Sequence, residues 1–287
     1  MPHEPPIKCH GKKTRLVPWI RTYLHLGKDA TYYEPFMGSG AVGFSILADR
    51  KIPTSAAFSD INPHLIGFYE YLQKYGEVAP DMLRYYLKEG GGLLRRLGSD
   101  HYYDVRNRFN HGDGEDFPPA CPVDFLFLNR SCFNGVLRFN SKGEFNTPFC
   151  KNTERFSPSY ITKIVNQIKW VQGIFAYHSC SFLHIPFDAA IRRAGRGDVI
   201  YCDPPYLGRN TGYNGQWTEE HERVLHRALV RTKAKFVLSS WKGNAVQQNE
   251  HLALWKNFRI VKREYTYIVG PKVENRYPMT EVLVMNF

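Results

Sequence analysis

Apolar and polar positions alternate along the chain in two stretches, and a block of different character separates them. In the first stretch, apolar residues at helical spacing predict a helix over 14–26 and a second helix over 41–48. Short β-rich runs predict strands over 31–34 and 55–59. Because helix and strand alternate here, we expect a mostly parallel sheet covered by helices.

From Cys180 the same alternation returns. It predicts three strands, over 181–185, 199–203 and 236–240, and three helices, over 188–194, 218–231 and 244–255. Thr218 is a candidate helix cap, because Glu219 and Glu220 follow it and their charges favour a helix N-terminus. Two strand-like runs, 259–269 and 280–287, predict an antiparallel hairpin at the end of the sheet.

The middle block is rich in tyrosine and arginine. It contains the run Gly90-Gly91-Gly92 and a polar loop over 110–116. We therefore predict one α/β domain formed by residues 1–64 and 176–287, with residues 65–175 inserted as a second domain.

Composition predicts a folded intracellular protein. Of the 287 residues, 43% are hydrophobic, which is enough for a large core. No apolar run reaches the roughly 18 residues of a membrane span, and the first residues lack the apolar stretch of a signal peptide. The six cysteines are scattered without a C-x-x-C pair, so we expect neither a metal site nor disulfides, and a cytoplasmic location.

The chain is strongly basic. It carries 38 Lys and Arg against 27 Asp and Glu, a net charge of +11 with a pI near 9.3. A nucleic-acid partner explains this excess, since phosphate contacts then supply much of the affinity. A generic basic surface is the alternative, and the charge does not distinguish DNA from RNA.

Candidate chemistry is concentrated in Asp203-Pro204-Pro205-Tyr206, after an apolar strand. A planar exocyclic amine is a poor nucleophile, and two acceptors on its hydrogens favour a reactive tetrahedral shape. The Asp203 carboxylate and the Pro204 carbonyl can be these acceptors, since Pro205 lacks an N–H and stiffens the backbone. Tyr206 offers a ring on which a base can stack. The alternative is a buried strand that ends in a proline-rich turn.

A second motif lies earlier in the chain. Glu34-Pro35-Phe36-Met37-Gly38-Ser39-Gly40 follows a strand and opens a helix, where glycines let the backbone approach a ligand closely. With Gly43 the glycines also match the dinucleotide pattern, but the Glu-Pro-Phe start favours a ligand without pyrophosphate. Asp60 ends the next strand, where an acid commonly binds a ribose diol; it can also cap the helix after Asn62. With the amine-activating motif, these features indicate S-adenosylmethionine and a methyl acceptor.

In this order, the motifs resemble those of the Dam-type DNA adenine-N6 methyltransferases, the D12 class with α motif order. Gly11-Lys12 is similar to the first cofactor segment, and Ser59-Asp60-Ile61-Asn62 to the ribose motif. The resemblance is most extensive over residues 127–149. It implies a Rossmann-like class I methyltransferase sheet, an inserted, mainly helical target-recognition domain with a β-hairpin, and S-adenosylmethionine as cofactor.

The resemblance also assigns residues. It implies that Arg138 reads a guanine and that Pro148 touches a base pair. Independently of the family, Phe133 and Asn134 lie at a tip where an aromatic ring and an amide can enter the base stack when the target base is flipped out. Asn140 to Gly143 is a good hairpin turn. The alternative is that Phe133 and Phe139 are core and Arg138 contacts phosphate. The full set of implied DNA-binding residues is Arg130, Phe133, Asn134, Val136, Arg138, Asn140, Pro148, Lys151 and Asn152.

Three segments depart from the family pattern. Lys8-Cys9-His10-Gly11-Lys12 replaces Trp-Ala-Gly-Gly-Lys, which affects cofactor contacts there. Pro186-Phe187 replaces Asp-Phe, so Phe187 can stack beside the cofactor adenine but the acid is absent. Cys150-Lys151-Asn152 replaces Gly-Arg-Tyr, which alters contacts to an outer base. The resemblance favours GATC as the recognition sequence.

The predicted reaction is in-line methyl transfer to adenine N6 of double-stranded DNA, with no metal required. Tyr213 and Trp217 are candidates for the base pocket or for the core, and Asn275-Arg276 for phosphate contact or a surface turn. Alternatives are methylation of RNA adenine or cytosine N4, and a DNA-binding protein with an inactive cofactor site. The sequence leaves open whether a restriction endonuclease accompanies the protein.

Overall fold

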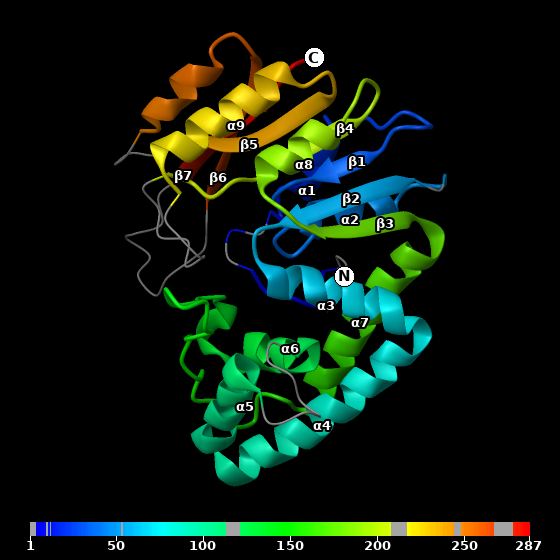
Figure 1. Cartoon of the computed structure of the whole chain (residues 1–287), viewed down its shortest axis with the longest axis vertical. Helices are drawn as coiled ribbons and strands as arrows, with labels where there is room; N and C mark the ends of the chain where they lie inside the picture. The colour runs from blue at the N-terminus through cyan, green and yellow to red at the C-terminus, as the bar shows by residue number, and fades with distance from the viewer. Residues whose placement is uncertain are drawn as a thin grey trace.

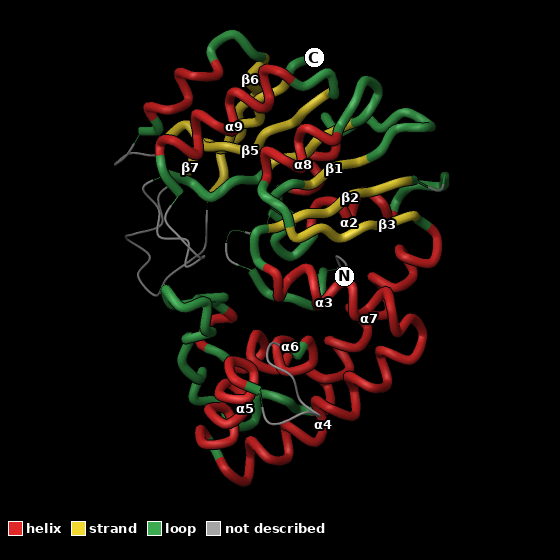
Figure 2. The backbone as a smooth tube through the Cα atoms, in the orientation of Figure 1, coloured by secondary structure: helices red, strands yellow, loops and turns green. Residues whose placement is uncertain are grey.

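The centre of the molecule is a twisted sheet with helices on both faces (Figures 1 and 2). The computed structural model describes residues 4–9, 11, 13–52, 54–112, 121–207, 217–243, 248–266 and 278–287. Within these residues the sheet has seven strands in the order β3-β2-β1-β4-β5-β7-β6. The strands are β1 (Tyr32–Glu34), β2 (Ser55–Asp60), β3 (Ser179–His184), β4 (Val199–Cys202), β5 (Lys235–Gly243), β6 (Arg259–Thr266) and β7 (Pro278–Met285).

Strand direction confirms the predicted parallel sheet with an antiparallel end. Strands β3, β2, β1, β4 and β5 are parallel, whereas β7 is antiparallel to both β5 and β6. Strand β1 pairs with both β2 and β4, because Tyr32 lies opposite Ala56 on one side and Val199 on the other. The chain order reverses between β1 and β4, and in open α/β sheets ligands bind outside the carboxyl ends of the strands at such a point.

Two hydrophobic clusters cover the two faces of the sheet. One contains Phe44 and Phe58 and continues into the inserted helices. The other contains Ile200, Leu225 and Trp255. Every residue of β4 is buried, as expected for a parallel strand with both faces covered. The covering helices are α1 (Val17–Arg21), α2 (Ala41–Ala48), α8 (Phe187–Arg193), α9 (Glu219–Arg231) and the 3₁₀ helix η3 (Glu250–Trp255).

A mainly helical lobe is inserted between β2 and β3, below the sheet in Figure 1. It comprises α3 (Pro63–Tyr75), η1 (Gly76–Val78), α4 (Ala79–Leu97), α5 (Ser99–His111), α6 (Pro122–Ser131), η2 (Phe133–Gly135) and α7 (Pro158–Tyr177). Helices α3 and α7 also contact the sheet, so they connect the two parts without a linker. The boundaries at residues 64 and 175 stay predictions.

The glycine run of the middle block lies inside a helix. Gly90 and Gly91 are buried in α4, where added Cβ atoms would come within 2.9 Å of the Phe127 ring and 2.7 Å of Phe156 Cβ. Close approach of neighbouring aromatic side chains, and not a turn, therefore accounts for these two glycines.

Two predicted elements differ from the structure. The first helix is only five residues long, since Pro18 marks its start and Thr22 Oγ1 bonds back to the Trp19 carbonyl at its end. Of the helix predicted over 244–255, the described part is helical only from Glu250 to Trp255, and there it is the 3₁₀ helix η3 and not an α-helix. Residues 244–247 and 267–277 lie outside the described residues. The cap at Thr218 is confirmed, with His221 completing a capping box.

Candidate active site and DNA-contacting hairpin

The glycine motif forms a tight turn between β1 and α2. Gly38 and Gly40 have φ of +49° and +71°, and the Gly40 N–H donates to the Met37 carbonyl at 2.7 Å. The Phe44 ring would lie 2.5 Å from a Cβ on Gly40, whereas nothing lies within 4 Å of a Cβ on Gly38. The turn is therefore closely packed at Gly40 and has free space at Gly38. Pro35 and Ser39 are buried beneath it.

Glu34 lies under this turn and does not project toward a ligand. Its Oε2 accepts hydrogen bonds from the Tyr32 hydroxyl and the Gly43 N–H, both at 2.9 Å, and its side chain is buried. Burial raises the pKa of Glu34 to about 8, although these two donors act in the opposite direction. We therefore correct the predicted cofactor contact: Glu34 joins β1 to α2 and shapes the turn.

Asp60 connects the carboxyl ends of β1 and β2. Its Oδ2 accepts from the Gly38 N–H at 2.8 Å and its Oδ1 from the Asn62 N–H at 2.9 Å. Burial raises the pKa of Asp60, and these N–H donors oppose that rise. The cap of α3 is Asn62, whose Oδ1 accepts from the His64 and Leu65 amides, so the capping role considered for Asp60 is wrong. The Ile61 N–H is a third donor to this carboxylate, which with about four lone-pair sites keeps capacity for one further donor.

Aromatic side chains from three segments gather beside the turn. Phe36 stacks on Phe187 with ring centroids 5.1 Å apart, and Trp217 contacts both rings at 5.6 and 5.4 Å. The Trp217 indole N–H donates to Glu222 Oε1 at 2.9 Å. Phe187 thus lies next to Phe36 of the glycine motif, and its contact with the cofactor adenine stays a prediction. Trp217 belongs to this aromatic group, and Tyr213 is outside the described residues.

These groups fit S-adenosylmethionine. The space at Gly38 admits a ligand against the backbone, Asp60 offers an acceptor for a ribose hydroxyl, and the half-buried Phe36 and Phe187 rings offer apolar surface to a purine. Ile61 is 56% exposed at the same edge, and its carbonyl contacts His184 Nε2 at 3.1 Å. The predicted contact Lys12 lies outside the described residues.

The catalytic motif follows β4, next to the glycine motif. Strand β4 carries the Asp203 carboxylate to the sheet edge, where its side chain is 22% exposed. Burial raises the pKa of Asp203 to about 6; the Lys13 ammonium, 3.5 Å from Oδ1, lowers it and Glu281 raises it. Pro204 is buried and Pro205 is half-buried, which holds the backbone of the motif rigidly.

Tyr206 is held at both its ring and its hydroxyl. The hydroxyl accepts from Lys13 Nζ at 2.6 Å and donates to Glu281 Oε2 at 3.0 Å, and the ring stacks on Trp241 with centroids 6.4 Å apart. Sequence reasoning missed Lys13 and Glu281. No local signal in the sequence shows that Lys13, and not Lys12, contacts Tyr206. For Glu281, an acid at the start of the apolar run Val282–Met285 is a weak signal.

The hairpin predicted after α6 is present as a turn with two isolated antiparallel bridges, Phe139–Phe145 and Cys132–Phe149. The Gly143 N–H donates to the Asn140 carbonyl at 3.0 Å, which confirms the turn. Phe139 and Phe145 are buried, so the core interpretation holds for Phe139. The packing of buried rings, and not a long ladder of backbone hydrogen bonds between strands, therefore stabilises this loop.

The hairpin meets the cofactor side of the molecule through His64. The His64 ring stacks on Phe139 with centroids 5.0 Å apart, and the His64 amide donates to Asn62 beside Asp60. Burial lowers the pKa of His64 to about 4, so the ring is neutral near pH 7. An uncharged aromatic contact thus connects the start of α3 to the hairpin.

Several predicted DNA-contacting side chains are exposed on the hairpin. Phe133 is 54% exposed, and Asn134 beside it has a positive φ of 54°. Arg138 is exposed and donates to Asn146 twice, from Nε to Oδ1 at 2.7 Å and from a terminal nitrogen to the carbonyl at 2.9 Å. Three more predicted residues are exposed and two are half-buried: Pro148, Lys151 and Asn152, and Val136 and Asn140.

Arg130 is the exception. Its side chain is 2% exposed, and its guanidinium donates to the Pro6 carbonyl, to Gln167 Oε1 at 2.6 Å and to the Tyr160 hydroxyl at 3.3 Å. The predicted DNA contact is therefore corrected to a supporting role, in which Arg130 ties α6 to α7 and to the N-terminal segment.

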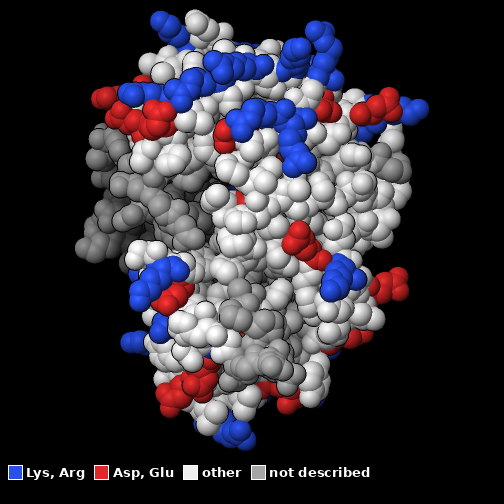
Figure 3. Space-filling view, viewed as in Figure 1, with Lys and Arg blue, Asp and Glu red and all other residues white. Residues whose placement is uncertain are grey.

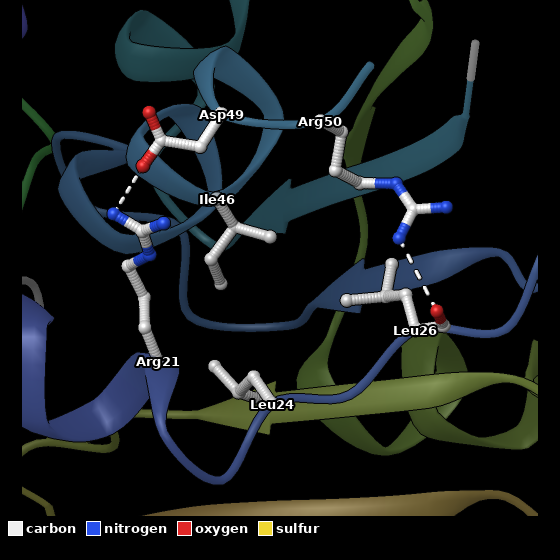
Figure 4. Close-up of a pocket in the computed structure, with 6 residues that line it drawn as sticks. All are labelled: Arg21, Leu24, Leu26, Ile46, Asp49 and Arg50. Atoms are coloured by element: carbon white, nitrogen blue, oxygen red, sulfur yellow. Dashed lines mark hydrogen bonds and ion pairs between the residues drawn. The ribbon is translucent and has the colours of Figure 1, made fainter. Parts of the chain in front are cut away.

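The basic charge is not confined to the hairpin. In Figure 3, Lys and Arg side chains gather above α9, and a smaller group lies over the loop between α6 and α7. On α9, Arg223 and Arg227 pair with Glu219 and Glu220, which reduces the net charge of that face. A surface pocket between α1 and α2 lies apart from the motifs; it is lined by Arg21, Leu24, Leu26, Ile46, Asp49 and Arg50 (Figure 4).

The fold and the site define a methyltransferase, and comparison with known proteins gives its class. The model of the D12 class N6 adenine-specific DNA methyltransferases matches residues 10–269, so the chain belongs to this family. It is an enzyme that transfers a methyl group from S-adenosylmethionine to adenine in DNA. The family decides against the RNA, cytosine-N4 and inactive alternatives.

Individual relatives extend over nearly the whole chain. The DNA adenine methylase of Serratia marcescens is 31% identical, over 97% of both chains. The Type II methyltransferase M1.LlaDCHI of Lactococcus lactis subsp. cremoris is 27% identical, over 99% of this chain and 95% of its own. The DNA adenine methylase of Haemophilus influenzae is 31% identical, over 79% of this chain and 73% of its own.

In the described part of the chain, no three His, Cys, Asp or Glu side chains come together as a metal site would require. None of the described helices combines the length and the apolar character that crossing a bilayer demands.

Proposed function

We propose that the protein methylates adenine in double-stranded DNA, within GATC or a related site, after turning the target base out of the helix. The observation that carries this proposal is the hairpin between α6 and α7, which exposes Phe133, Asn134 and Arg138. In Figure 1 this loop lies on the same side of the molecule as the carboxyl ends of the parallel strands.

Arg138 is suited to reading a base. Asn146 accepts from two of its nitrogens and so holds the planar guanidinium in one orientation. An arginine placed in this way donates its remaining N–H groups to guanine O6 and N7 in the major groove. Pro148 adds an exposed apolar contact, and Lys151 and Asn152 are the candidates for the outer base.

Phe133 and Asn134 are suited to the gap that a flipped base leaves. The Phe133 amide donates to the Pro148 carbonyl at 2.8 Å, which fixes the backbone while the ring stays exposed. An enzyme that acts on a base must remove it from the stack, at a cost of a few kcal/mol. An aromatic ring that replaces the lost stacking offsets part of that cost.

The chemistry at the target amine falls to the residues after β4. S-adenosylmethionine supplies a methyl group on a sulfonium. Asp203 and the Pro204 carbonyl accept the two amine hydrogens, and the Tyr206 ring lies against the face of the base. Because the pKa of Asp203 is about 6, its carboxylate is mostly ionised above pH 7 and can accept these hydrogens. The proton leaves after methyl transfer, so Asp203 need not be a strong base.

Arg138→Ala is expected to reduce discrimination between GATC and a duplex with one altered guanine by roughly 10- to 100-fold, the 1–3 kcal/mol of a bidentate contact. Arg138→Lys keeps the positive charge but loses the planar guanidinium with its paired N–H donors. It should therefore retain non-specific DNA binding and still lose discrimination. Competition binding with the two duplexes measures both effects. Equal discrimination by wild type and both variants would show that Arg138 does not read a base.

Phe133→Ala is expected to weaken binding of the target duplex about 10-fold, the order of one base-stacking contact. A 2-aminopurine at the target adenine should brighten when wild-type protein and S-adenosylhomocysteine are added, and brighten less with the variant. Tyr85→Ala is the matched control, because Tyr85 is 70% exposed on α4, away from the hairpin. An unchanged 2-aminopurine signal with wild-type protein bound would contradict base flipping.

A further inference from the structure

A buried carboxylate from the last strand of the sheet reaches the catalytic motif. Glu281 is 1% exposed in β7, next to the apolar run Val282–Met285. Its Oε2 accepts from the Tyr206 hydroxyl at 3.0 Å and lies 3.6 Å from Lys13 Nζ. Burying an ionised group is costly unless it is paired, and Lys13 and Tyr206 are the partners that a carboxylate at this position needs.

The strand register makes β7 part of the Tyr206 site. Glu281 lies directly opposite Trp241 of β5, the residue on which the Tyr206 ring stacks. Paired residues of adjacent strands project to the same face of a sheet. Trp241 therefore holds the ring of Tyr206, while Glu281 holds its hydroxyl from the neighbouring strand.

Lys13 is shared between two carboxylates. Its Nζ lies 3.5 Å from Asp203 and 3.6 Å from Glu281, and its short hydrogen bond, 2.6 Å, goes to the Tyr206 hydroxyl. A contact of 3.5 Å is longer than a normal charged hydrogen bond. Lys13 thus contacts both acids at similar distances, and its short bond to the Tyr206 hydroxyl, which Glu281 also holds, keeps it between them.

We propose that Glu281 is a positioning residue for methyl transfer: it fixes the Tyr206 hydroxyl and shares Lys13 with Asp203, so that Asp203 and the Tyr206 ring meet the target base in a set geometry. This inference rests on the proposed function, in which the base enters between these two groups. Glu281 acts through its neighbours and does not touch the substrate.

The charges that surround this site come from several elements. Lys13 precedes α1, and Asp203 and Tyr206 follow β4. Burial raises the pKa of Tyr201 on β4 and of Glu34 on β1, which favours their neutral forms near pH 7. Arg263 of β6 lies opposite Glu281 in register, but it is exposed and stacks on Trp19. Lys13, Asp203 and Glu281 are therefore the charged groups that set the pH response.

Glu281→Gln is expected to lower the single-turnover rate of methyl transfer to unmethylated plasmid roughly 10- to 100-fold, the scale of a misplaced reacting group. S-adenosylhomocysteine affinity should stay within about threefold, below the effect of one lost hydrogen bond. The acid limb of the pH–rate profile should move to lower pH. The reason is that removing a like charge and strengthening the Lys13 pair both favour ionised Asp203.

Two further variants separate positioning from folding. Glu281→Asp keeps the charge but shortens the reach, so it should slow the rate while the acid limb stays near its wild-type position. Glu264→Gln removes an exposed acid from neighbouring β6 and should behave as wild type. Thermal denaturation of each variant identifies misfolding.

The possible outcomes distinguish failure of this inference from failure of the proposed function on which it rests. An inactive wild-type protein would overturn the proposed function. An active wild type together with a Glu281→Gln variant of unchanged rate and unchanged acid limb would overturn the inference alone. A slower Glu281→Gln variant whose acid limb does not move would also overturn it, because a purely structural role lowers the rate equally at all pH values.

Discussion

Asp203→Ala is expected to abolish methyl transfer, with a loss of at least about 1000-fold, the scale of removing one preorganised electrostatic contact at the reacting group. Asp203 is the acceptor that biases the amine toward a nucleophilic shape, and its neighbours cannot replace it, because Lys13 is a donor and the Tyr206 hydroxyl is bonded to Lys13 and Glu281. Cofactor binding should be largely spared, since the glycine turn and Asp60 lie on other strands. Single-turnover kinetics and titration calorimetry with S-adenosylhomocysteine measure the two effects; wild-type-like turnover would contradict the assignment.

The same position should carry a stability cost. Because folding raises the pKa of Asp203 from its usual 3.8 to about 6, the ionised carboxylate is less stable in the folded than in the unfolded protein. Its destabilising effect is full above pH 6 and vanishes below pH 3.8. Asp203→Asn should therefore raise the free energy of unfolding at pH 8 by about 1 kcal/mol, and by less at pH 5. Urea denaturation at both pH values tests this, and a variant that is less stable than wild type at pH 8 would contradict it.

Gly43→Ala is expected to lower the free energy of unfolding by about 3 kcal/mol, the upper range for overpacking a core. The added methyl would lie 2.3 Å from Glu34 Oε2 and 2.4 Å from the Phe58 ring, and both neighbours are buried. Relieving these contacts moves α2 away from β1, which should weaken S-adenosylhomocysteine binding as well. The gain in helix propensity, about 1 kcal/mol, is smaller than the strain.

Gly67→Ala provides the matched control. Gly67 is also helical, in α3, and nothing lies within 4 Å of a Cβ placed there. The substitution should be neutral or stabilise by up to about 1 kcal/mol. Urea denaturation of the two variants side by side tests the argument, and equal stability of both would show that the α2–β1 contact tolerates a methyl group.

The local motifs could be predicted because their signals are local. The turn from Phe36 to Gly40 is signalled by glycines after a strand, and the position of Asp203 by the buried strand that precedes it. The cap at Thr218 is predictable for the same reason, since its partner His221 lies three residues away. The conformation of such elements depends on residues only a few positions apart, and the structure contains them as predicted.

The polar network around Tyr206 could not be predicted in this way. Lys13 and Tyr206 are 193 positions apart, and Tyr206 and Glu281 are 75 apart, so only the folded sheet brings them together. The exposure of side chains could not be predicted either. Arg130 and Arg138 lie eight positions apart in one motif, yet the first is buried and the second is exposed. Arg130 is buried because it bonds to Gln167 and Tyr160 of α7, and no local signal reveals that contact.

The most direct test of the central claim is to incubate purified protein with S-adenosylmethionine and unmethylated plasmid, and to map modified bases by long-read sequencing. We predict N6-methyladenine at GATC with wild type and none with Asp203→Ala. N6-methyladenine at another motif would retain the chemistry and contradict the interpretation of the hairpin around Arg138, Lys151 and Asn152. Methylation on cytosine, or no modified adenine with wild type, would contradict the account as a whole.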